Sequence, residues 1–316
     1  MRRNFLIQNS AEKITRNIQK VFVGNPQTIQ LMIVAVLCEG HALLEDVPGT
    51  GKTTLARCLA ASLGCSFRRI QFTPDLLPSD VTGLSWFNQK NQEFEFRPGP
   101  IMSQVILADE INRATPRTQS AMLEAMQERQ VTGEGVTRLL PRPFLVLATQ
   151  NPIELEGTFP LPEAQIDRFL LRITIGYPSQ EDENAILERF KLVDPLPDLI
   201  AVTSPEELLN LQTERRQVRV EASVRDYIVR VARATRQNAD IQLGASPRAT
   251  LSLFQSSQAW AAIQGRDFVL PDDIKFMAPY VFCHRLILSA QAQLRGRTTA
   301  ELLADIVSTV PVPVEA

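Results

Sequence analysis

Short apolar runs and amphipathic stretches alternate along the first 190 residues, and this alternation predicts a layered fold. Apolar runs of strand length occur at residues 41–45, 66–72, 103–110, 143–151 and 169–178. Apolar residues recur three and four positions apart, as on one helix face, at residues 10–22, 26–38, 53–63, 117–129 and 179–190. Strands that alternate with helices are typical of a doubly wound α/β domain. We therefore expect a central parallel sheet of five strands flanked by helices.

Capping residues and turns refine this expectation. Ser10 should cap the first helix, Asn25-Pro26 should open the second, and Gly64 should end the helix that begins near Thr53. Residues 81–97 hold two β-prone runs on either side of the polar turn NQKN, and residues 131–137 read VTGEGVT. Both segments predict β-hairpins inserted into the α/β domain.

The strand pattern ends after Pro178, and only helical periodicity follows, up to Val310. Three prolines close together, Pro195, Pro197 and Pro205, indicate a linker. We expect an α/β domain over residues 1–192, a linker over 193–203, and a smaller all-α domain over 204–316.

Composition excludes several kinds of protein. Lys and Arg number 33 and Asp and Glu number 35, so the formal net charge is −2. This balance argues against a protein whose main task is neutralising nucleic-acid phosphates. Two histidines, and four cysteines without CxxC spacing, predict neither a zinc site nor a histidine-dependent triad. The longest apolar run, residues 31–38, is too short to span a bilayer, and a cytoplasmic protein is expected.

The strongest chemical signal is EDVPGTGKTT at residues 45–54, between an apolar strand and a helix. Gly49 and Gly51 let the backbone turn its N–H groups toward a phosphate chain, and the helix N-terminus adds further donors. Lys52 can reach the β- and γ-phosphates, and the Thr53 hydroxyl can bind Mg²⁺. The expected binding residues for ATP are Asp46, Val47, Pro48, Gly49, Thr50, Gly51, Lys52, Thr53 and Thr54.

One residue departs from the phosphate-loop pattern G-x-x-x-x-G-K-[ST]. The pattern places glycine at position 46, where this chain has Asp46. A carboxylate beside phosphates is not obviously favourable, so Asp46 is expected to cap the turn while facing away from the ligand.

The second signal is VILADE at residues 105–110, an apolar strand that ends in two acids. In α/β sheets this edge binds ligands. Asp109 is expected to hold Mg²⁺ through water, and Glu110 to orient and polarise an attacking water. Asn151 follows the fourth strand and is expected to bond the γ-phosphate or the water. Arg168, Arg172 and Arg248 are candidates for lending positive charge to the γ-phosphate.

The set PGTGKT, LADEINRA, ATQNP, LPEAQIDRF and GASPRA, in this order and spacing, resembles the MoxR family of AAA+ ATPases. The two hairpins resemble those of the AAA+ branch that also holds magnesium-chelatase subunits and MCM helicases. The resemblance implies that Lys52 and Thr53 are Walker A residues, and Asp109 and Glu110 the Walker B pair. It also implies that Asn151 is sensor 1, that Arg168 is the finger acting on a neighbour's ATP, and that Arg248 is sensor 2 on a lid. It gives Arg113 and Arg172 no firm role.

The resemblance further implies a hexameric ring that acts as a chaperone, maturing or activating a client protein. A partner with a von Willebrand factor A domain, and metal insertion into some clients, also belong to this expectation. Loss of the γ-phosphate would break contacts to Asn151, to Arg248 and to the neighbour's Arg168, and the hairpins would then push on a client. Trp86 and Phe87 could contact that client, although packing within their own hairpin is the favoured interpretation.

Three other functions stay open at this point. A magnesium-chelatase-like motor and an MCM-like DNA translocase share the branch, although the single lysine in the two hairpin tips is thin support for binding a DNA strand. A scaffold that binds ATP without hydrolysing it is the third. The presence of Glu110, Asn151 and Arg168 argues against it.

Overall fold

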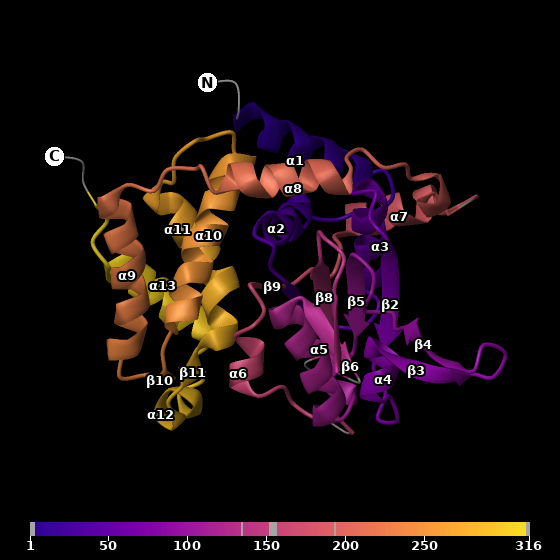
Figure 1. The fold of residues 1–316 in the computed structure, drawn as a ribbon. Helices are drawn as coiled ribbons and strands as arrows, with labels where there is room; N and C mark the ends of the chain where they lie inside the picture. Colours follow the sequence, from indigo (N-terminus) through magenta and orange to yellow (C-terminus); the bar gives the residue numbers. More distant parts are fainter. Residues whose placement is uncertain (1–3, 134, 152–156, 193, 314–316) are drawn as a thin grey trace.

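The computed structural model describes residues 4–133, 135–151, 157–192 and 194–313. Figure 1 shows an α/β part, which holds the central sheet, beside a helical part formed by about the last third of the chain. The sheet has the order β2-β5-β8-β1-β9 and all its pairings are parallel. The expected five-stranded parallel sheet with flanking helices and a helical second part is confirmed.

The strands lie close to the expected ranges, with one exception. They are β1 (Ala42–Glu45), β2 (Phe67–Gln71), β5 (Val105–Asp109), β8 (Leu145–Gln150) and β9 (Leu171–Ile173). β9 is therefore much shorter than the apolar run 169–178 that predicts it. The central strands β5 and β8 are buried along nearly their whole length, as expected of strands covered on both faces.

The helices of the α/β part are α1 (Asn4–Ile18), α2 (Pro26–Leu37), α3 (Lys52–Ser62), α4 (Pro78–Thr82), α5 (Pro116–Glu128), α6 (Glu163–Ile166) and α7 (Gln180–Arg189). Asn25 caps α2 as expected, since its side chain accepts from the N–H of Gln27. The prediction for Ser10 is wrong. Ser10 lies inside α1, where its hydroxyl donates to Glu207 at 3.3 Å, and the helix begins six residues earlier.

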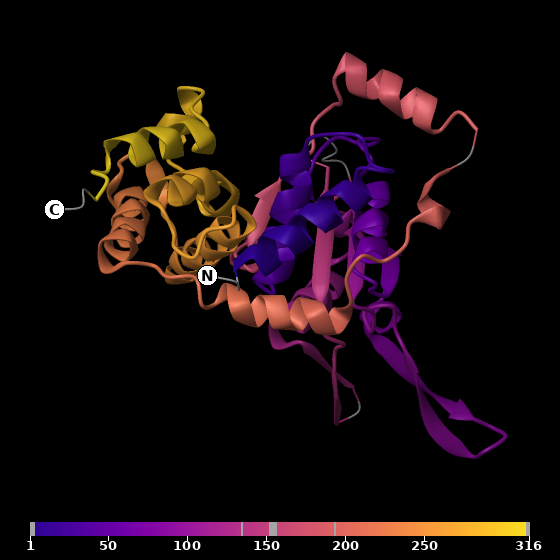
Figure 2. The same ribbon diagram turned by 90° about the horizontal axis from the view of Figure 1, so that it is seen from above.

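Both expected hairpins are present. β3 (Gly83–Asn88) pairs with β4 (Glu93–Pro98), and β6 (Gln130–Gly133) pairs with β7 (Val136–Leu139). Figure 2 shows the β3–β4 hairpin extending well away from the body of the molecule. Arg138 of the second hairpin lies 3.8 Å from the ring centre of Phe96 in the first, so the two hairpins contact each other. Trp86 and Phe87 are about half exposed.

The later part of the chain is mainly helical. Its helices are α8 (Pro205–Arg215), α9 (Ala222–Gln237), α10 (Pro247–Ile263), α11 (Pro271–Phe282), α12 (Ala290–Leu294) and α13 (Thr299–Thr309). The expectation of helices alone is wrong at one point, because β10 (Ile241–Leu243) pairs antiparallel with β11 (Ile287–Leu288). Strands of three and two residues are too short to produce a periodic pattern, and their pairing spans more than 40 residues.

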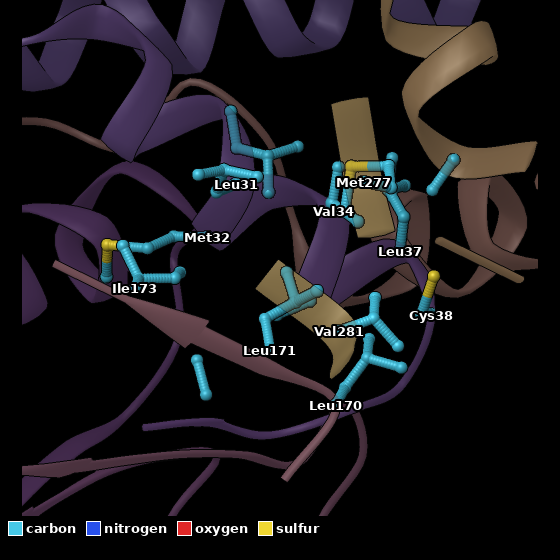
Figure 3. Close-up of a cluster of buried hydrophobic side chains, with 14 of the residues drawn as sticks. Leu31, Met32, Val34, Leu37, Cys38, Leu170, Leu171, Ile173, Met277 and Val281 are labelled. Atoms are coloured by element: carbon cyan, nitrogen blue, oxygen red, sulfur yellow. The ribbon is translucent and has the colours of Figure 1, made fainter. Parts of the chain in front are cut away.

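A continuous core joins the helical part to the α/β part. Leu31, Val34 and Leu37 of α2 lie beside Leu171 of β9 and Met277 and Val281 of α11 (Figure 3). All six side chains are buried. The helical part is thus packed against the β9 edge of the sheet. None of the described helices combines the length and hydropathy needed to cross a membrane.

A buried histidine just before β1 contacts β8 and α5, and it makes the stability of the fold depend on pH. His41 Nδ1 accepts from the Val146 N–H at 3.0 Å, and Nε2 lies 3.1 Å from the Met126 carbonyl oxygen. Burial lowers the pKa of His41 to about 4, from a usual value of 6.5. The unfolded chain therefore binds a proton that the folded chain does not between these two pH values, so His41 stabilises the fold above pH 6.5 and loses that contribution as the pH falls toward 4.

We expect the free energy of unfolding to be about 2 kcal/mol lower at pH 5 than at pH 7.5 through His41 alone, since one pKa unit corresponds to about 1.4 kcal/mol. Urea unfolding at both pH values measures the difference. His41→Asn, which keeps an acceptor but does not titrate, should show a smaller difference. His284, whose pKa burial also lowers, contributes equally to both proteins. An equal pH dependence in the two proteins would remove His41 from this explanation.

Candidate active site

The expected phosphate-binding and acidic residues lie together at the carboxyl edge of the sheet. A cavity of about 360 Å³ is lined by Pro48, Gly49, Gly51, Lys52, Thr53, Arg69, Asp109, Glu110, Thr149, Gln150 and Asn151. These residues come from the loop and helix start after β1, from the carboxyl ends of β5 and β8 with the residue that follows each, and from Arg69 in β2. Parallel pairing brings the carboxyl ends of these strands to one edge of the sheet. We call this space the phosphate cavity.

The loop between β1 and α3 has the backbone shape that phosphate binding requires. Gly49 and Gly51 have φ angles of +87° and +83°, which side-chain-bearing residues rarely adopt. The N-terminal turn of α3 begins at Lys52 and leaves N–H groups without intrahelical partners. Lys52 Nζ donates to the carbonyl oxygens of Asp46 and Val47, at 3.0 and 2.6 Å. The ammonium group therefore lies against the loop, within reach of a ligand in the cavity.

Asp46 has a structural position that explains why it can replace glycine. Its side chain is buried, and one carboxylate oxygen accepts from the N–H of Val47 at 2.8 Å. The other accepts from the N–H groups of Ile175 and Gly176, at 2.9 and 2.7 Å. As expected, the carboxylate caps the turn. It also joins the loop to the segment that follows β9.

Replacing Asp46 with alanine should lower the free energy of unfolding by about 2 kcal/mol or more, because buried N–H groups lose a charged acceptor. Asp46→Gly restores the glycine of the usual loop pattern and should lose as much, whereas Asp46→Asn keeps one acceptor oxygen and should lose less. Chemical denaturation measures all three. If Asp46→Gly proved as stable as the parent, the carboxylate contacts would contribute nothing.

The two acids after β5 are held by Thr149. The Thr149 hydroxyl donates to Asp109 at 2.5 Å and accepts from the backbone N–H of Glu110 at 2.8 Å. Glu110 itself has a left-handed backbone conformation, with φ of 56° and ψ of 48°. Strained residues of this kind persist where surrounding contacts fix them, and they cluster at functional sites. Sequence reasoning did not identify Thr149, although it lies in the fourth strand beside Asn151.

Arg69 and Gln71 of β2 also belong to the site, and sequence reasoning missed both. The parallel register places Gln71 opposite Asp109. Arg69 forms an ion pair with Asp109 at 2.6 Å, and the Gln71 amide donates to Glu110 at 2.7 Å. Arg113 reaches Glu110 from the following turn, at 3.2 Å. Both carboxylates therefore have partners, which fix the orientation of the acid pair.

A second cavity lies on the other side of the phosphate loop. It has a volume of about 600 Å³ and shares Gly49 and Gly51 with the phosphate cavity. Its remaining walls are mostly apolar: Val21, Phe22 and Val23 after α1, Ile175, Tyr177 and Pro178 after β9, and Ile186 and Phe190 near α7, with Thr54 at the loop. An apolar space beside a phosphate loop suits a planar base.

Two of the three expected arginines, Arg168 and Arg248, line neither cavity beside the phosphate loop of their own chain. Arg168 precedes β9 and Arg248 is the second residue of α10, and both line a third cavity of about 780 Å³. Gly40 and His41, which precede β1, line it too, so this cavity is at the amino edge of the sheet. A four-residue strand such as β1 spans about 13 Å. Arg248 and the phosphate loop thus line cavities at opposite edges of the sheet.

This amino-edge space, the arginine cavity, carries excess positive charge. Its walls include Arg129, Arg168, Arg215, Arg216, Arg248 and Arg285 but only two acids, Glu39 and Asp167. Glu39 pairs with Arg129 and Arg216 and, outside the cavity wall, with Arg142. Burial opposes ionisation of Glu39, but these arginines outweigh it and lower its pKa.

Arg168 and Arg248 differ from the other arginines of the cavity. Within the described part of the chain, neither guanidinium forms an ion pair or a side-chain hydrogen bond. Unpaired guanidinium groups in one cavity attract an anion with several oxygens. Arg172, the other candidate, points elsewhere: it pairs with Glu45 at 2.9 Å.

The chain is similar to known ATPases over most of its length. Residues 41–171 match the family described as "ATPase family associated with various cellular activities (AAA)", and residues 233–306 match the AAA lid domain. The uncharacterized protein YeaC of Bacillus subtilis is 49% identical over 96% of this chain and 95% of its own length. Chaperone MoxR1 of Mycobacterium tuberculosis is 42% identical, covering 96% of this chain and 83% of its own.

Similarity to a solved structure covers the whole architecture. A crystal structure of a Cytophaga hutchinsonii protein, named as a candidate ATPase, superposes with a TM-score of 0.92 at 38% sequence identity. The match covers 98% of this chain and 97% of that one. The overall architecture is thus shared over nearly the whole of both chains.

Proposed function

The chain belongs to the MoxR family of AAA+ ATPases, and from that premise we propose that it hydrolyses ATP in sites shared between neighbouring copies. The main observation behind the proposal is that the groups needed for hydrolysis lie far apart within one chain. The phosphate loop and the acid pair lie at the carboxyl edge of the sheet, and the unpaired arginines lie at the amino edge. A ring that brings the arginine cavity of one copy to the phosphate cavity of the next would complete the site.

The residues of the phosphate cavity fit ATP with Mg²⁺. Mg²⁺ favours oxygen ligands and is usually bound by one or two protein oxygens plus substrate phosphates and water. The Thr53 hydroxyl and the Asp109 carboxylate line the same cavity, and a carboxylate has lone pairs beyond those that Arg69 and Thr149 occupy. Among the described residues, no cluster of three or more His, Cys, Asp or Glu side chains could hold a metal ion. Bound there, Mg²⁺ would neutralise phosphate charge.

Each remaining residue has a task that its position supports. The loop N–H groups and Lys52 hold the phosphates, with Lys52 exchanging its carbonyl partners for phosphate oxygens. Glu110 accepts the proton of the attacking water as general base. Gln71 and Arg113 hold its carboxylate in place. Asn151, on the wall of the same cavity, orients the water or the γ-phosphate.

The neighbouring copy supplies the positive charge. Arg168 and Arg248 would both meet the γ-phosphate of the adjacent subunit, where charge builds up during transfer. The resemblance implies that Arg248 is sensor 2 on a lid, and we propose that this residue acts on the ATP of the adjacent copy. When the γ-phosphate leaves, the contacts that join two copies weaken, and the interface shifts.

We propose that this shift of the subunit interface drives chaperone activity on another protein. A homologue that matches this chain over 83% of its own length carries the name Chaperone MoxR1. We propose a hexameric ring whose projecting hairpins transmit motion to a client, with an adaptor that holds a von Willebrand factor A domain. Maturation of a client by metal insertion would be one use of such motion.

Hydrolysis of ATP in the presence of Mg²⁺, measured per subunit over a wide range of protein concentration, tests the proposal. The specific rate should rise as subunits associate, because an isolated chain lacks the arginines that its own site needs. A substantial rate that stays flat down to the most dilute sample would show that each chain hydrolyses alone. The shared site would then be wrong.

A further inference from the structure

A buried arginine of the helical part makes several hydrogen bonds to the segment that carries Arg168. Arg285 lies between α11 and β11, and its side chain is 2% exposed. Its Nε donates to the Asp167 carboxylate at 2.7 Å. Its two Nη groups donate to the backbone carbonyl oxygens of Asp167, Phe169 and Leu170, at 3.2, 2.6 and 3.3 Å. These acceptors flank Arg168 on both sides.

The same carboxylate also reaches the segment that carries Arg248. Ser246 is the N-cap of α10, and its hydroxyl donates to the two Asp167 oxygens at 3.3 and 3.2 Å. Ser246 also accepts from the N–H of Ala249, which fixes the first turn that holds Arg248. Asp167, one residue before Arg168, thus binds two segments of the helical part. One carries Arg285, and the other carries Ser246, which lies two residues before Arg248.

Chemistry explains why arginine suits this position. A buried guanidinium must have acceptors for its five N–H groups, and its planar fork can serve several at fixed angles. Burial lowers the pKa of Arg285 to about 10 against the opposing effect of Asp167, so it stays charged at neutral pH. Lysine offers a single donor atom and cannot hold the Asp167 carboxylate and three carbonyl groups in the same geometry.

We propose that Arg285 and Asp167 are positioning residues that hold Arg168 and Arg248 as one unit, aimed at the nucleotide of the neighbouring copy. This inference rests on the proposed shared site. It implies that the helical part of each chain is held directly to its own arginine edge. A shift of the helical part in one copy would therefore move Arg168 and Arg248 relative to the ATP of the neighbouring copy.

The test begins with Arg285→Gln, Arg285→Lys and Asp167→Asn. ATP binding by each variant should persist, because the phosphate loop lies at the opposite edge. At saturating ATP, kcat should fall about a hundredfold in Arg285→Gln, since small misplacements of a catalytic group have effects of that size. KM should change far less, and Arg285→Lys should recover only part of kcat.

Arg266→Gln is the matched control. Arg266 pairs with Asp273 in the same helical part, and neither residue lines the arginine cavity. The Arg266→Gln substitution removes a comparable part-buried ion pair. It should therefore lower thermal stability while leaving kcat close to the parent value. A kcat loss as large as that of Arg285→Gln would make the effect a general result of weakening the helical part, and would overturn the proposal.

Mixed rings provide a measurement that a purely structural role of Arg285 would leave unchanged. Arg285→Gln subunits keep an intact phosphate cavity, so adding Glu110→Gln subunits, which keep intact arginines, should restore hydrolysis. Adding Arg168→Ala subunits should not, because both variants then lack a working arginine edge. Rescue by Arg168→Ala, or no rescue by either, overturns the proposal. If Arg285→Gln does not assemble, Asp167→Asn takes its place in the same mixtures.

Failure of this inference can be told apart from failure of the shared site. A full rate in Arg168→Ala alone would refute the shared site on which the inference rests. A large loss in Arg168→Ala together with a full rate in both Arg285→Gln and Asp167→Asn would leave the shared site standing and refute only the positioning role.

Discussion

Replacing Glu110 with glutamine is expected to slow ATP hydrolysis by at least about a hundredfold, since a positioned general base contributes 10²- to 10⁴-fold. The glutamine amide keeps the size of the side chain and can still bond Gln71, but it does not accept a proton from water. Lys52, Thr53 and the loop N–H groups are untouched, so ATP binding should be retained. Single-turnover hydrolysis and binding of a fluorescent ATP analogue measure the two quantities separately.

Glu124→Gln provides the control for this experiment. Glu124 is exposed on α5 and lines neither cavity at the carboxyl edge, so the same change of charge should leave the rate near the parent value. A full rate in Glu110→Gln would remove Glu110 from the mechanism. Loss of both binding and hydrolysis would instead mean that Glu110 maintains the cavity rather than the chemistry.

Replacing Arg168 with alanine is expected to reduce hydrolysis by about a thousandfold or more, the usual effect of removing an arginine that stabilises charge on a transferring phosphoryl group. Arg168 makes no ion pair or side-chain hydrogen bond within the described chain, so the fold should lose little stability. ATP should still bind to the variant, because its own phosphate cavity is complete. Steady-state hydrolysis and thermal unfolding together measure both expectations.

Arg225→Ala is the matched control for Arg168. Arg225 is exposed on α9 of the same chain and lines none of the three cavities. Its loss removes the same charge from the surface and should leave the rate unchanged. If Arg168→Ala also kept the parent rate, the arginine cavity would have no part in hydrolysis.

The elements and the phosphate loop could be predicted because their signals are local. Asn25-Pro26 fixes a helix start within two residues, and the PGTGKT run carries its own backbone geometry. Ser10 misled the prediction because its environment is tertiary: α8 packs against α1, and the Ser10 hydroxyl donates to Glu207 from inside the helix. β10 and β11 escaped detection because neither strand is long enough for a period to show.

The residues around the acids could not be predicted for a related reason. Arg69 and Gln71 lie about 40 positions before the acid pair, and only the parallel register of β2 with β5 brings them together. The location of Arg248 likewise depends on how the helical part packs against β9 and α2. Sequence can suggest that an arginine follows Ser246-Pro247, but the edge of the sheet it faces is a property of the assembled core.

The central claim is that one ATP site is built from two copies of the chain, and mixing two inactive variants tests it most directly. Glu110→Gln subunits lack the base but present intact arginines, and Arg168→Ala subunits have the base but no finger. Each alone should be nearly inactive. Mixed at concentrations where subunits associate, they should recover a substantial fraction of the parent rate at interfaces that join an intact loop to an intact arginine edge. A mixture no more active than the sum of its two components would contradict the shared site.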